Sequence, residues 1–337
     1  MSMMWTPCVV RSAVPDEVPV RLGHEVIDSY LRFVWARARR NTLLAVGFDL
    51  KVFFTVVAKD PTEVTVADVL GFIETQRRPT RGDNVVRLED GEAGLSARTI
   101  RRRLSSVSGL FEYLVATEVV AKNPVPRGLG SRTNRRRGVP LVRSPRTLPR
   151  ILNPDEVDAL VGALRTWRDR AMIEAMLLGG LRRCEVLGLG LGDLNAGERR
   201  VFIAEGKGGH QRITPISNRL FETLAIYLDR ERPETVTDRV FVVLKGPRRG
   251  EPLSAPGVDQ VMRGARDRAA LTHATCHELR HTCLTRLREA GMALEAVQAQ
   301  AGHRSIETTR LYLHLANDWL AEEYHRAAWA IDIDTPA

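Results

Sequence analysis

Apolar residues recur every three or four positions in the first part of the chain, and this spacing predicts helices. One group runs from Leu22 to Val34, a second from Leu43 to Val52, and a third helix is expected over 66–76. Ser96 is suited to cap a longer helix, whose apolar positions are Ile100, Leu104, Val107, Leu110, Phe111 and Leu114. The polar, glycine-containing stretch before Ser96 is predicted to be a loop. These patterns predict a helical bundle over residues 21–122, preceded by an N-terminal arm at 1–20.

A second domain is predicted over residues 151–315. Asn153-Pro154-Asp155-Glu156 provides a helix cap, a proline in the first turn and early acids. Two strand-like segments, 200–204 and 212–216, flank the turn Gly206-Lys207-Gly208-Gly209 and predict a β-hairpin. Helical patterns otherwise dominate, and residues 316–337 are expected to form an amphipathic terminal helix or tail. The expected fold is therefore mainly α: an N-terminal helical bundle and a mainly helical domain with a small antiparallel β-sheet.

Basic charge is concentrated in the front half of the chain. The protein carries a net charge of +9, and residues 21–150 hold 24 Lys and Arg against 13 Asp and Glu, whereas residues 151–337 hold 25 against 26. The segment 123–150 reads as an extended basic linker, since residues 127–150 contain eight arginines and no acid. A solvated hinge would have this composition, but tracking of a DNA backbone is the favoured interpretation. The candidate DNA-binding residues are Arg98, Arg101, Arg102 and Arg103 on the predicted helix and Arg132, Arg135, Arg136 and Arg137 in the linker.

The sequence favours a cytoplasmic protein. No apolar run approaches the ~18 residues that a membrane span needs, and residues 1–20 lack the apolar stretch of a signal peptide. The four cysteines have neither metal-site nor disulfide-framework spacing, which fits a reducing compartment.

Three segments of the second domain carry residues suited to phosphoryl transfer. Arg182 precedes Glu185 by three residues, which places both on one helical face. His277 and Arg280 are one helical turn apart, and His303 precedes Tyr312 by nine residues. Breaking a DNA strand without losing its bond energy requires a nucleophile that forms a covalent intermediate. It also requires guanidinium groups for the non-bridging oxygens and an acid for the leaving oxygen.

In this order the segments resemble the tyrosine site-specific recombinases of the phage integrase family. The resemblance covers the whole second domain: G-L-R-x-x-E around Arg182, a lysine in the hairpin turn, H-x-L-R-H at 277–281, and G-H-x-S-I-x-T-T-x-x-Y-x-H from Gly302 to His314. The helical front with its basic linker is similar, more loosely, to the family's core-binding domain. Two positions depart from the family pattern, with Cys184 where serine is common and Ala301 where leucine usually stands. Cys184 is interpreted as a small packing residue rather than a thiol nucleophile, and alanine at 301 would loosen local packing without removing any chemical group.

The resemblance implies the role of each site residue. Arg182 and Arg280 would hold the scissile phosphate, Lys207 would protonate the leaving 5′ oxygen, and Tyr312 would attack. The implied assisting residues are His277 and His303, with Glu185 and Asp193 as supporting acids. Without the resemblance, Lys207 would read as a solvent-facing turn residue and Tyr312 as a half-buried helix aromatic.

The resemblance also implies partners and reaction. The expected activity is strand cleavage and rejoining through a 3′-phosphotyrosyl intermediate, in integration, excision or transposition, with no metal or cofactor. The expected partners are double-stranded DNA with inverted half-sites and further copies of the chain, from dimer to tetramer. The target sequence does not follow from these residues, nor does the choice among phage integrase, transposon recombinase and chromosome-dimer resolvase.

Other functions fit parts of the sequence. His277-Glu278-Leu279-Arg280-His281 satisfies H-E-x-x-H, the motif of zinc metalloproteases, with Glu278 as the base. That reading leaves Arg182, Lys207 and Tyr312 unexplained. A catalytically degenerate DNA-binding protein would keep the fold without the reaction, and a type IB topoisomerase would share the chemistry but act as a monomer.

Overall fold

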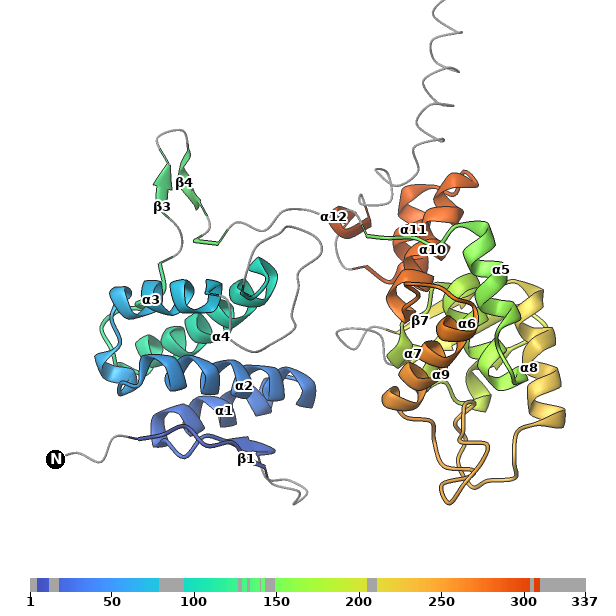
Figure 1. Cartoon of the computed structure of the whole chain (residues 1–337), viewed down its shortest axis with the longest axis horizontal. Helices are drawn as coiled ribbons and strands as arrows, with labels where there is room; N and C mark the ends of the chain where they lie inside the picture. Colours follow the sequence, from blue (N-terminus) through green and yellow to red (C-terminus); the bar gives the residue numbers. More distant parts are fainter. Residues whose placement is uncertain are drawn as a thin grey trace, which may run out of the picture. The chain divides into compact units, whose positions relative to one another are not determined.

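The computed structural model describes residues 5–11, 18–78, 94–126, 129–131, 134–139, 141–142, 149–204, 211–303 and 306–309. The chain divides into two compact units, residues 1–146 and 147–337 (Figure 1). Helices dominate both units, and the strands pair into small antiparallel sheets. The prediction of a mainly α fold with a small antiparallel sheet is thereby confirmed.

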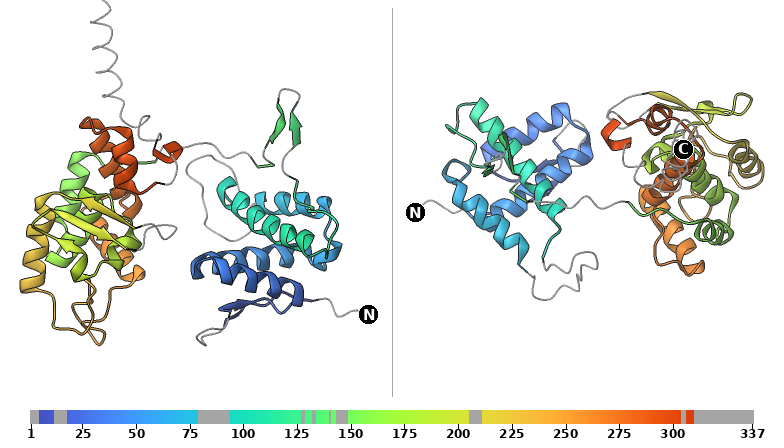
Figure 2. Two further views of the ribbon diagram at one scale, coloured as in Figure 1. Left: turned by 180° about the vertical axis from the view of Figure 1, so that it is seen from behind. Right: turned by 90° about the horizontal axis from the view of Figure 1, so that it is seen from above.

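The first unit is built around four helices, visible from two further directions in Figure 2. They are α1 (Glu25–Arg37), α2 (Arg40–Val57), α3 (Val66–Arg77) and α4 (Ala97–Ala116), and a short 3-10 helix, η1 (Pro61–Glu63), precedes α3. Helix α2 packs against the other three. Helix α4 begins as predicted, because the Ser96 hydroxyl accepts a hydrogen bond from the backbone N–H of Thr99. All six predicted apolar positions of α4 are buried in the core.

Two short hairpins flank these helices. Strands β1 (Val10–Arg11) and β2 (Val20–Arg21) pair antiparallel, and so do β3 (Leu129–Ser131) and β4 (Asn134–Val139). The described part of the predicted N-terminal arm packs on the helices, since Val18 and Val20 are buried in their core. Trp5 also packs against this core, and its indole N–H donates a hydrogen bond to the carbonyl of Leu22.

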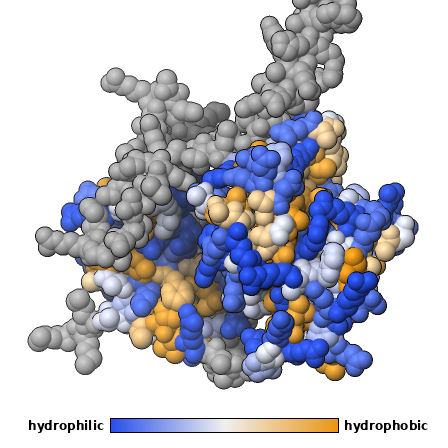
Figure 3. Space-filling view, turned by 45° about the vertical axis from the view of Figure 1, so that its right-hand side comes forward, coloured by the Kyte–Doolittle hydropathy of each residue, from blue (hydrophilic) through white to orange (hydrophobic). Residues whose placement is uncertain are grey.

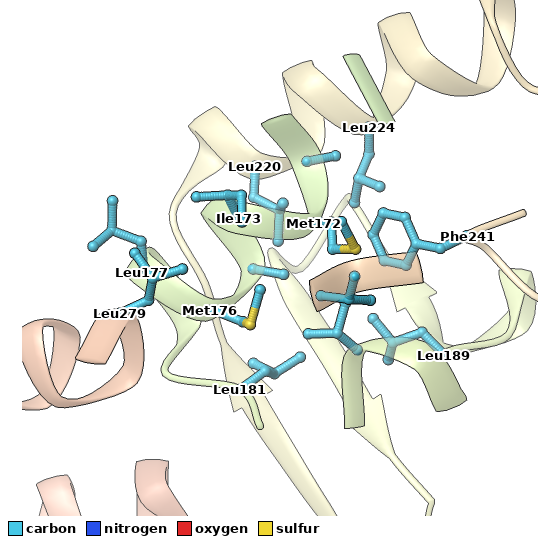
Figure 4. Packing of buried hydrophobic residues seen from close by; sticks show 14 of the residues in the cluster. Met172, Ile173, Met176, Leu177, Leu181, Leu189, Leu220, Leu224, Phe241 and Leu279 are labelled. Carbon is cyan, nitrogen blue, oxygen red and sulfur yellow. The ribbon is translucent and has the colours of Figure 1, made fainter. Parts of the chain in front are cut away.

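The core of the second unit surrounds helix α6 (Trp167–Gly179). This helix packs against α8 (Asn218–Arg230) and α10 (Cys276–Glu289), and nine of its 13 residues are buried. Figure 4 shows the side chains of this core, among them Met172, Ile173, Met176, Leu220, Leu224 and Phe241. Helix α5 (Pro154–Gly162) begins with the predicted cap, in which the Asn153 side chain accepts a hydrogen bond from the backbone N–H of Glu156.

A three-stranded antiparallel sheet completes this unit, with strand order β5 (Leu194–Asn195), β6 (Arg200–Ile203) and β7 (Arg212–Pro215) (Figure 2). In the register of β6 and β7, Val201 lies opposite Thr214, so the predicted hairpin is confirmed. The remaining helical elements are α7 (Arg183–Gly188), η2 (Leu191–Asp193), α9 (Ala255–Arg268), α11 (Leu294–Ala301) and α12 (Ile306–Thr309).

Most of the face in Figure 3 is hydrophilic, with smaller hydrophobic areas between polar side chains. Among helices in the described ranges, none combines the length and the apolar character that crossing a bilayer requires.

Candidate active site

Three of the predicted catalytic side chains line one open pocket of the second unit. The pocket has a volume of about 420 Å³ and is lined by Arg182, Arg183, Cys184, Asp259, Thr275, Cys276, His277 and Arg280. The start of α7, helix α9 and the start of α10 supply these residues. Segments almost 100 residues apart in the sequence therefore contribute three guanidinium groups and an imidazole to the same space.

Arg182 stands at the N-cap of α7 and is held by Glu185. Its backbone N–H donates to one carboxylate oxygen of Glu185 at 2.8 Å, and its Nη1 donates to the other at 2.7 Å. Nη2 donates to the carbonyl of Gly302 at 3.3 Å. The guanidinium group is thus held at two points and the backbone at a third, which limits the orientations that the side chain can adopt toward the pocket.

Glu185 is shared between two arginines. Arg212, at the start of β7, donates from Nη1 and Nη2 to the two carboxylate oxygens, each at 2.9 Å. Burial by itself would raise the pKa of Glu185, but the hydrogen bonds from Arg212 and from the backbone of Arg182 outweigh it and lower the pKa to about 2. The carboxylate therefore stays ionised at every physiological pH.

Arg280 is buried where the start of α10 meets the ends of α6 and α11. Its guanidinium donates to the carbonyl of Gly180 and, at 2.6 Å, to that of Ala301. Nη2 also lies 3.1 Å from Nε2 of His303. Arginine only donates, so Nε2 of His303 accepts, and Nδ1–H then donates to the Thr309 hydroxyl at 3.0 Å. His303 is therefore a neutral imidazole oriented from both sides.

The same surroundings keep His303 uncharged. Burial and the nearby positive charges of Arg280 and Arg182 lower its pKa to about 3. As a neutral group with Nδ1 protonated, His303 can accept a proton or a hydrogen bond only at Nε2.

Two glycines of the predicted motifs are explained by backbone conformation and packing. Gly180 and Gly302 end α6 and α11 with φ of 65° and 58°, in the left-handed region that favours glycine. A Cβ at Gly302 would also lie 3.0 to 3.2 Å from the guanidinium and Cδ of Arg212. The glycine before His303 therefore allows the chain to approach Arg212 closely.

His277 is exposed at the pocket, and its ring makes an edge contact with that of His281, with centroids 4.3 Å apart. His281 is buried, and this burial, followed by the charges of His277 and Arg280, lowers its pKa to about 4. Among the residues that the structure describes, no three His, Cys, Asp or Glu side chains form a group that could hold a metal ion.

The remaining predicted residues, including the two positions that depart from the family pattern, do not all lie at this pocket. Asp193 accepts a hydrogen bond from the backbone N–H of Gly190 and lines a second pocket, of about 320 Å³, together with Glu185. Cys184 is exposed and lines both pockets, so it is not the buried packing residue that the sequence suggested. Ala301 is fully buried.

Lys207 and Tyr312 lie outside the described residues, as does the predicted terminal segment 316–337.

The predicted DNA-binding arginines of α4 fall into two groups. Arg98 and Arg101 are exposed. Arg102 donates to the buried carboxylate of Asp49 at 2.6 Å, and Arg103 donates to Gln76 and lies 3.9 Å from Asp49. In the predicted linker, Arg132 lies outside the described residues. Arg135, Arg136 and Arg137 lie on β4, where the structure describes the backbone alone.

Two residues of the site were not assigned a role from the sequence. Arg212 begins the strand predicted after the lysine turn, where its position indicates no contact with Glu185. Gln300 belongs to none of the predicted motifs; its buried amide donates to the carbonyls of Gly179 and Pro215, at 3.0 Å each. It thereby joins α11, the end of α6 and β7. No motif spacing signals either role, because both depend on partners more than 25 residues away.

Comparisons with known proteins agree with this geometry. Residues 150–318 match the phage integrase family, and residues 27–118 match the N-terminal SAM-like domain of phage integrases. The chain is 30% identical over 314 residues to tyrosine recombinase XerD of Staphylococcus aureus, covering 89% of this chain and 97% of the relative. XerD of Staphylococcus saprophyticus is 29% identical over 317 residues, with the same coverage of both chains.

Solved structures share the fold. A lambda integrase dimer bound to a COC′ core site matches with a TM-score of 0.64 and 18% identity, over 86% of this chain and 94% of that one. The Tn1549 transposon integrase in complex with circular intermediate DNA matches with a TM-score of 0.61 and 19% identity, over 85% and 94%. The matched range 150–318 contains His277 and His281, so the comparisons give the zinc protease alternative no support.

Proposed function

The chain belongs to the phage integrase family of tyrosine recombinases, and we propose that its pocket cleaves and rejoins DNA strands at specific sites through a 3′-phosphotyrosyl intermediate. The observation that carries this proposal is the convergence of Arg182, Arg280 and His277 on one pocket, with His303 bonded to Arg280. Two fixed guanidinium groups at one opening suit a phosphodiester, whose non-bridging oxygens gain negative charge during the reaction.

In the proposed reaction, Arg182 and Arg280 hold the non-bridging oxygens of the scissile phosphate. Their own partners fix them in place: Glu185 and Gly302 for Arg182, Gly180 and Ala301 for Arg280. Groups that are oriented before the substrate arrives need no reorganisation as charge develops, and this is the main source of electrostatic catalysis. His277 and His303 provide hydrogen bonds at the edge of the same space.

Tyr312 and Lys207 complete the proposed chemistry. The phenol of Tyr312 passes its proton to one of the assisting histidines and its oxygen attacks the phosphorus, while the bond to the 5′ oxygen breaks and Lys207 gives that oxygen a proton. The DNA 3′ phosphate is then esterified to the tyrosine. A 5′ hydroxyl of a second strand reverses the steps and releases Tyr312, so the number of phosphodiester bonds is conserved. No cofactor or metal is required for this exchange.

The two units suggest how duplex DNA is bound. We propose that residues 21–122 and the basic segment 123–150 bind DNA beside the catalytic domain, 151–315, with 1–20 and 316–337 as terminal segments. The DNA-bound relatives support this, since the lambda integrase structure is a dimer on a core site. Inverted half-sites bound by a dimer, with a tetramer at strand exchange, follow from two-fold symmetry. We place this activity in the cytoplasm.

The decisive test removes the proposed nucleophile. Tyr312→Phe deletes only the attacking oxygen, so it should abolish the covalent protein–DNA adduct on a nicked suicide substrate while DNA binding stays close to wild type. The adduct is measured as a slower band on a denaturing gel, and binding by mobility shift on the same substrate. An adduct that persists in Tyr312→Phe would assign the attack to another residue.

A further inference from the structure

Glu185 lies between two positive charges, and this arrangement determines how much charge Arg182 offers the pocket. The carboxylate is fully buried, with a side-chain exposure of 0%, and it receives hydrogen bonds from both Arg182 and Arg212. The three groups together carry a net charge of +1. If Arg212 were absent, the same carboxylate would face Arg182 alone, and the local sum would be zero.

We propose, on the basis of the function above, that Arg212 is a positioning residue of the strand-cleavage reaction. It engages the carboxylate of Glu185 so that Arg182 remains an oriented and uncompensated cation for the scissile phosphate. Arg212 acts through Glu185 and Arg182, and its side chain is not among those that line the pocket.

Two contacts of the Arg212 guanidinium support this role. At Glu185, the two nitrogens and two oxygens form a bidentate pair, the strongest geometry available to arginine and a carboxylate. On its other side, the guanidinium packs against Gly302 so closely that a Cβ there would be 3.0 Å away. Arg212 therefore also supports the segment whose Gly302 carbonyl holds Arg182 and whose His303 contacts Arg280.

The first measurement is the single-turnover rate of adduct formation by Arg212→Gln with saturating DNA. Hydrogen bonds to charged groups of this kind correspond to a loss of about 10- to 100-fold. Arg212→Lys, which keeps the charge but not the bidentate geometry, should lose less. Wild-type adduct formation reports on the proposed function, whereas the ratio of variant to wild type reports on Arg212, so the two failures are distinguishable.

A substrate with reduced charge separates positioning from general structural support. Replacing one non-bridging oxygen of the scissile phosphate by a methyl group removes a negative charge, so that the transition state depends less on arginine charge. The difference between wild type and Arg212→Gln should largely disappear on this methylphosphonate. A merely structural role for Arg212 would leave the same deficit on both substrates and would overturn the proposal.

Neutralising the carboxylate gives an independent test. In the double variant Arg212→Gln with Glu185→Gln, no negative charge is left to compensate Arg182, so cleavage should recover relative to Arg212→Gln alone. A double variant that is as slow as the single variant, or slower, contradicts the charge mechanism even if both proteins fold.

The chain provides a matched control for loss of stability. Glu174 is another buried glutamate of the second unit, with a side-chain exposure of 1%, and it pairs with Arg170 and Arg219. Arg219→Gln removes an arginine partner of a buried glutamate away from the pocket, so it should lower thermal stability while adduct formation by the folded protein stays at the wild-type rate. A cleavage loss in Arg219→Gln equal to that of Arg212→Gln would mean that any broken pair of this kind slows the enzyme, and the positioning role would fail.

Discussion

Single side chains at the pocket take their charge state from the same few neighbours. Arg182 and Arg212 keep Glu185 ionised, while burial and the charge of Arg280 keep His303 neutral. His281, one turn beyond His277 on α10, is neutral for the same reasons. The pocket is therefore lined by permanently positive guanidinium groups, which suit a bound phosphate over a wide pH range, and the buried imidazoles of His281 and His303 beside Arg280 are uncharged.

These histidines predict how stability depends on pH. In the unfolded chain a histidine titrates near ~6.5, whereas folding lowers the pKa of His281 to about 4 and that of His303 to about 3. Between the unfolded and the folded pKa of each histidine, the unfolded chain binds more protons than the folded chain. The folded state therefore loses stability as the pH falls below about 6.5. The stability that neutral His281 contributes is present above this pH, and it declines until the pH reaches the folded pKa.

His281→Gln should therefore flatten the dependence of the free energy of unfolding on pH between about 6.5 and 4. Urea denaturation at several pH values measures this slope. His273→Gln is the matched control, because His273 is an exposed histidine of the same unit and its loss should leave the slope unchanged. Equal slopes for wild type and His281→Gln would contradict the assigned burial effect.

The structure brings Arg182, His277 and Arg280 to one pocket, as the motifs predict, but the sequence does not predict what holds them there. The motifs around Arg182, Arg280 and His303 could be selected in advance because their chemistry and order are distinctive. Arg212 could not, because an arginine in a strand is ordinarily a surface residue. Its role arises from a carboxylate 27 residues earlier in the sequence, which only the folded chain places against it.

Among the elements, α4 shows the limits of helical periodicity. The apolar face is predicted in full, because burial of every third or fourth residue is a local signal. The sequence predicts one basic stripe along the helix, whereas in the structure two of its four arginines pair with a buried acid and two do not. Arg102 and Arg103 turn toward Asp49 of α2, which is only 2% exposed, although half of the Arg102 side chain stays accessible; Arg98 and Arg101 are exposed and make no such pair in the described part of the chain. A buried acid on another helix leaves no trace in the pattern of α4 itself.

Because the arginines of α4 fall into these two groups, substitutions in one group should affect DNA binding and substitutions in the other should affect stability. Arg98→Ala combined with Arg101→Ala should weaken DNA binding and reduce the slope of log affinity against log salt by ~0.9 per lost phosphate contact, with little change in stability. Arg103→Ala should mainly lower the free energy of unfolding, because it removes a partner of buried Asp49 and of Gln76. Binding at three salt concentrations and urea denaturation measure the two effects. An unchanged slope in the first variant would remove α4 from the DNA interface.

For the molecule as a whole, local patterns sufficed for the fold class but not for the basic segment between the two units. The helices and the β6–β7 hairpin have clear apolar periods, and the structure confirms them. Strands β3 and β4 pair within a segment that was expected to be extended and linker-like. The alternation of apolar and polar residues that signals a strand is absent there, since arginines fill Arg135 to Arg137.

The basic segment between the two units leads to a prediction about how the whole protein binds DNA. If Arg135, Arg136 and Arg137 contact phosphates, replacing all three by alanine should flatten the salt slope of DNA binding by about two to three units. The loss should be similar on specific and random duplexes, because phosphate contacts position a protein without reading the sequence. Mobility shifts at three or more salt concentrations on both duplexes measure these quantities.

A control with the same change in net charge separates contact from general electrostatics. Arg230, Arg248 and Arg249 are exposed arginines of the second unit, and their triple alanine variant also removes three positive charges. Long-range attraction alone would weaken binding equally in the two variants, whereas phosphate contacts weaken it in the 135–137 variant only. An unchanged slope in that variant would identify the segment as a solvated hinge. A loss confined to the specific duplex would instead assign these arginines to base or minor-groove recognition, because only such contacts depend on the sequence of the DNA.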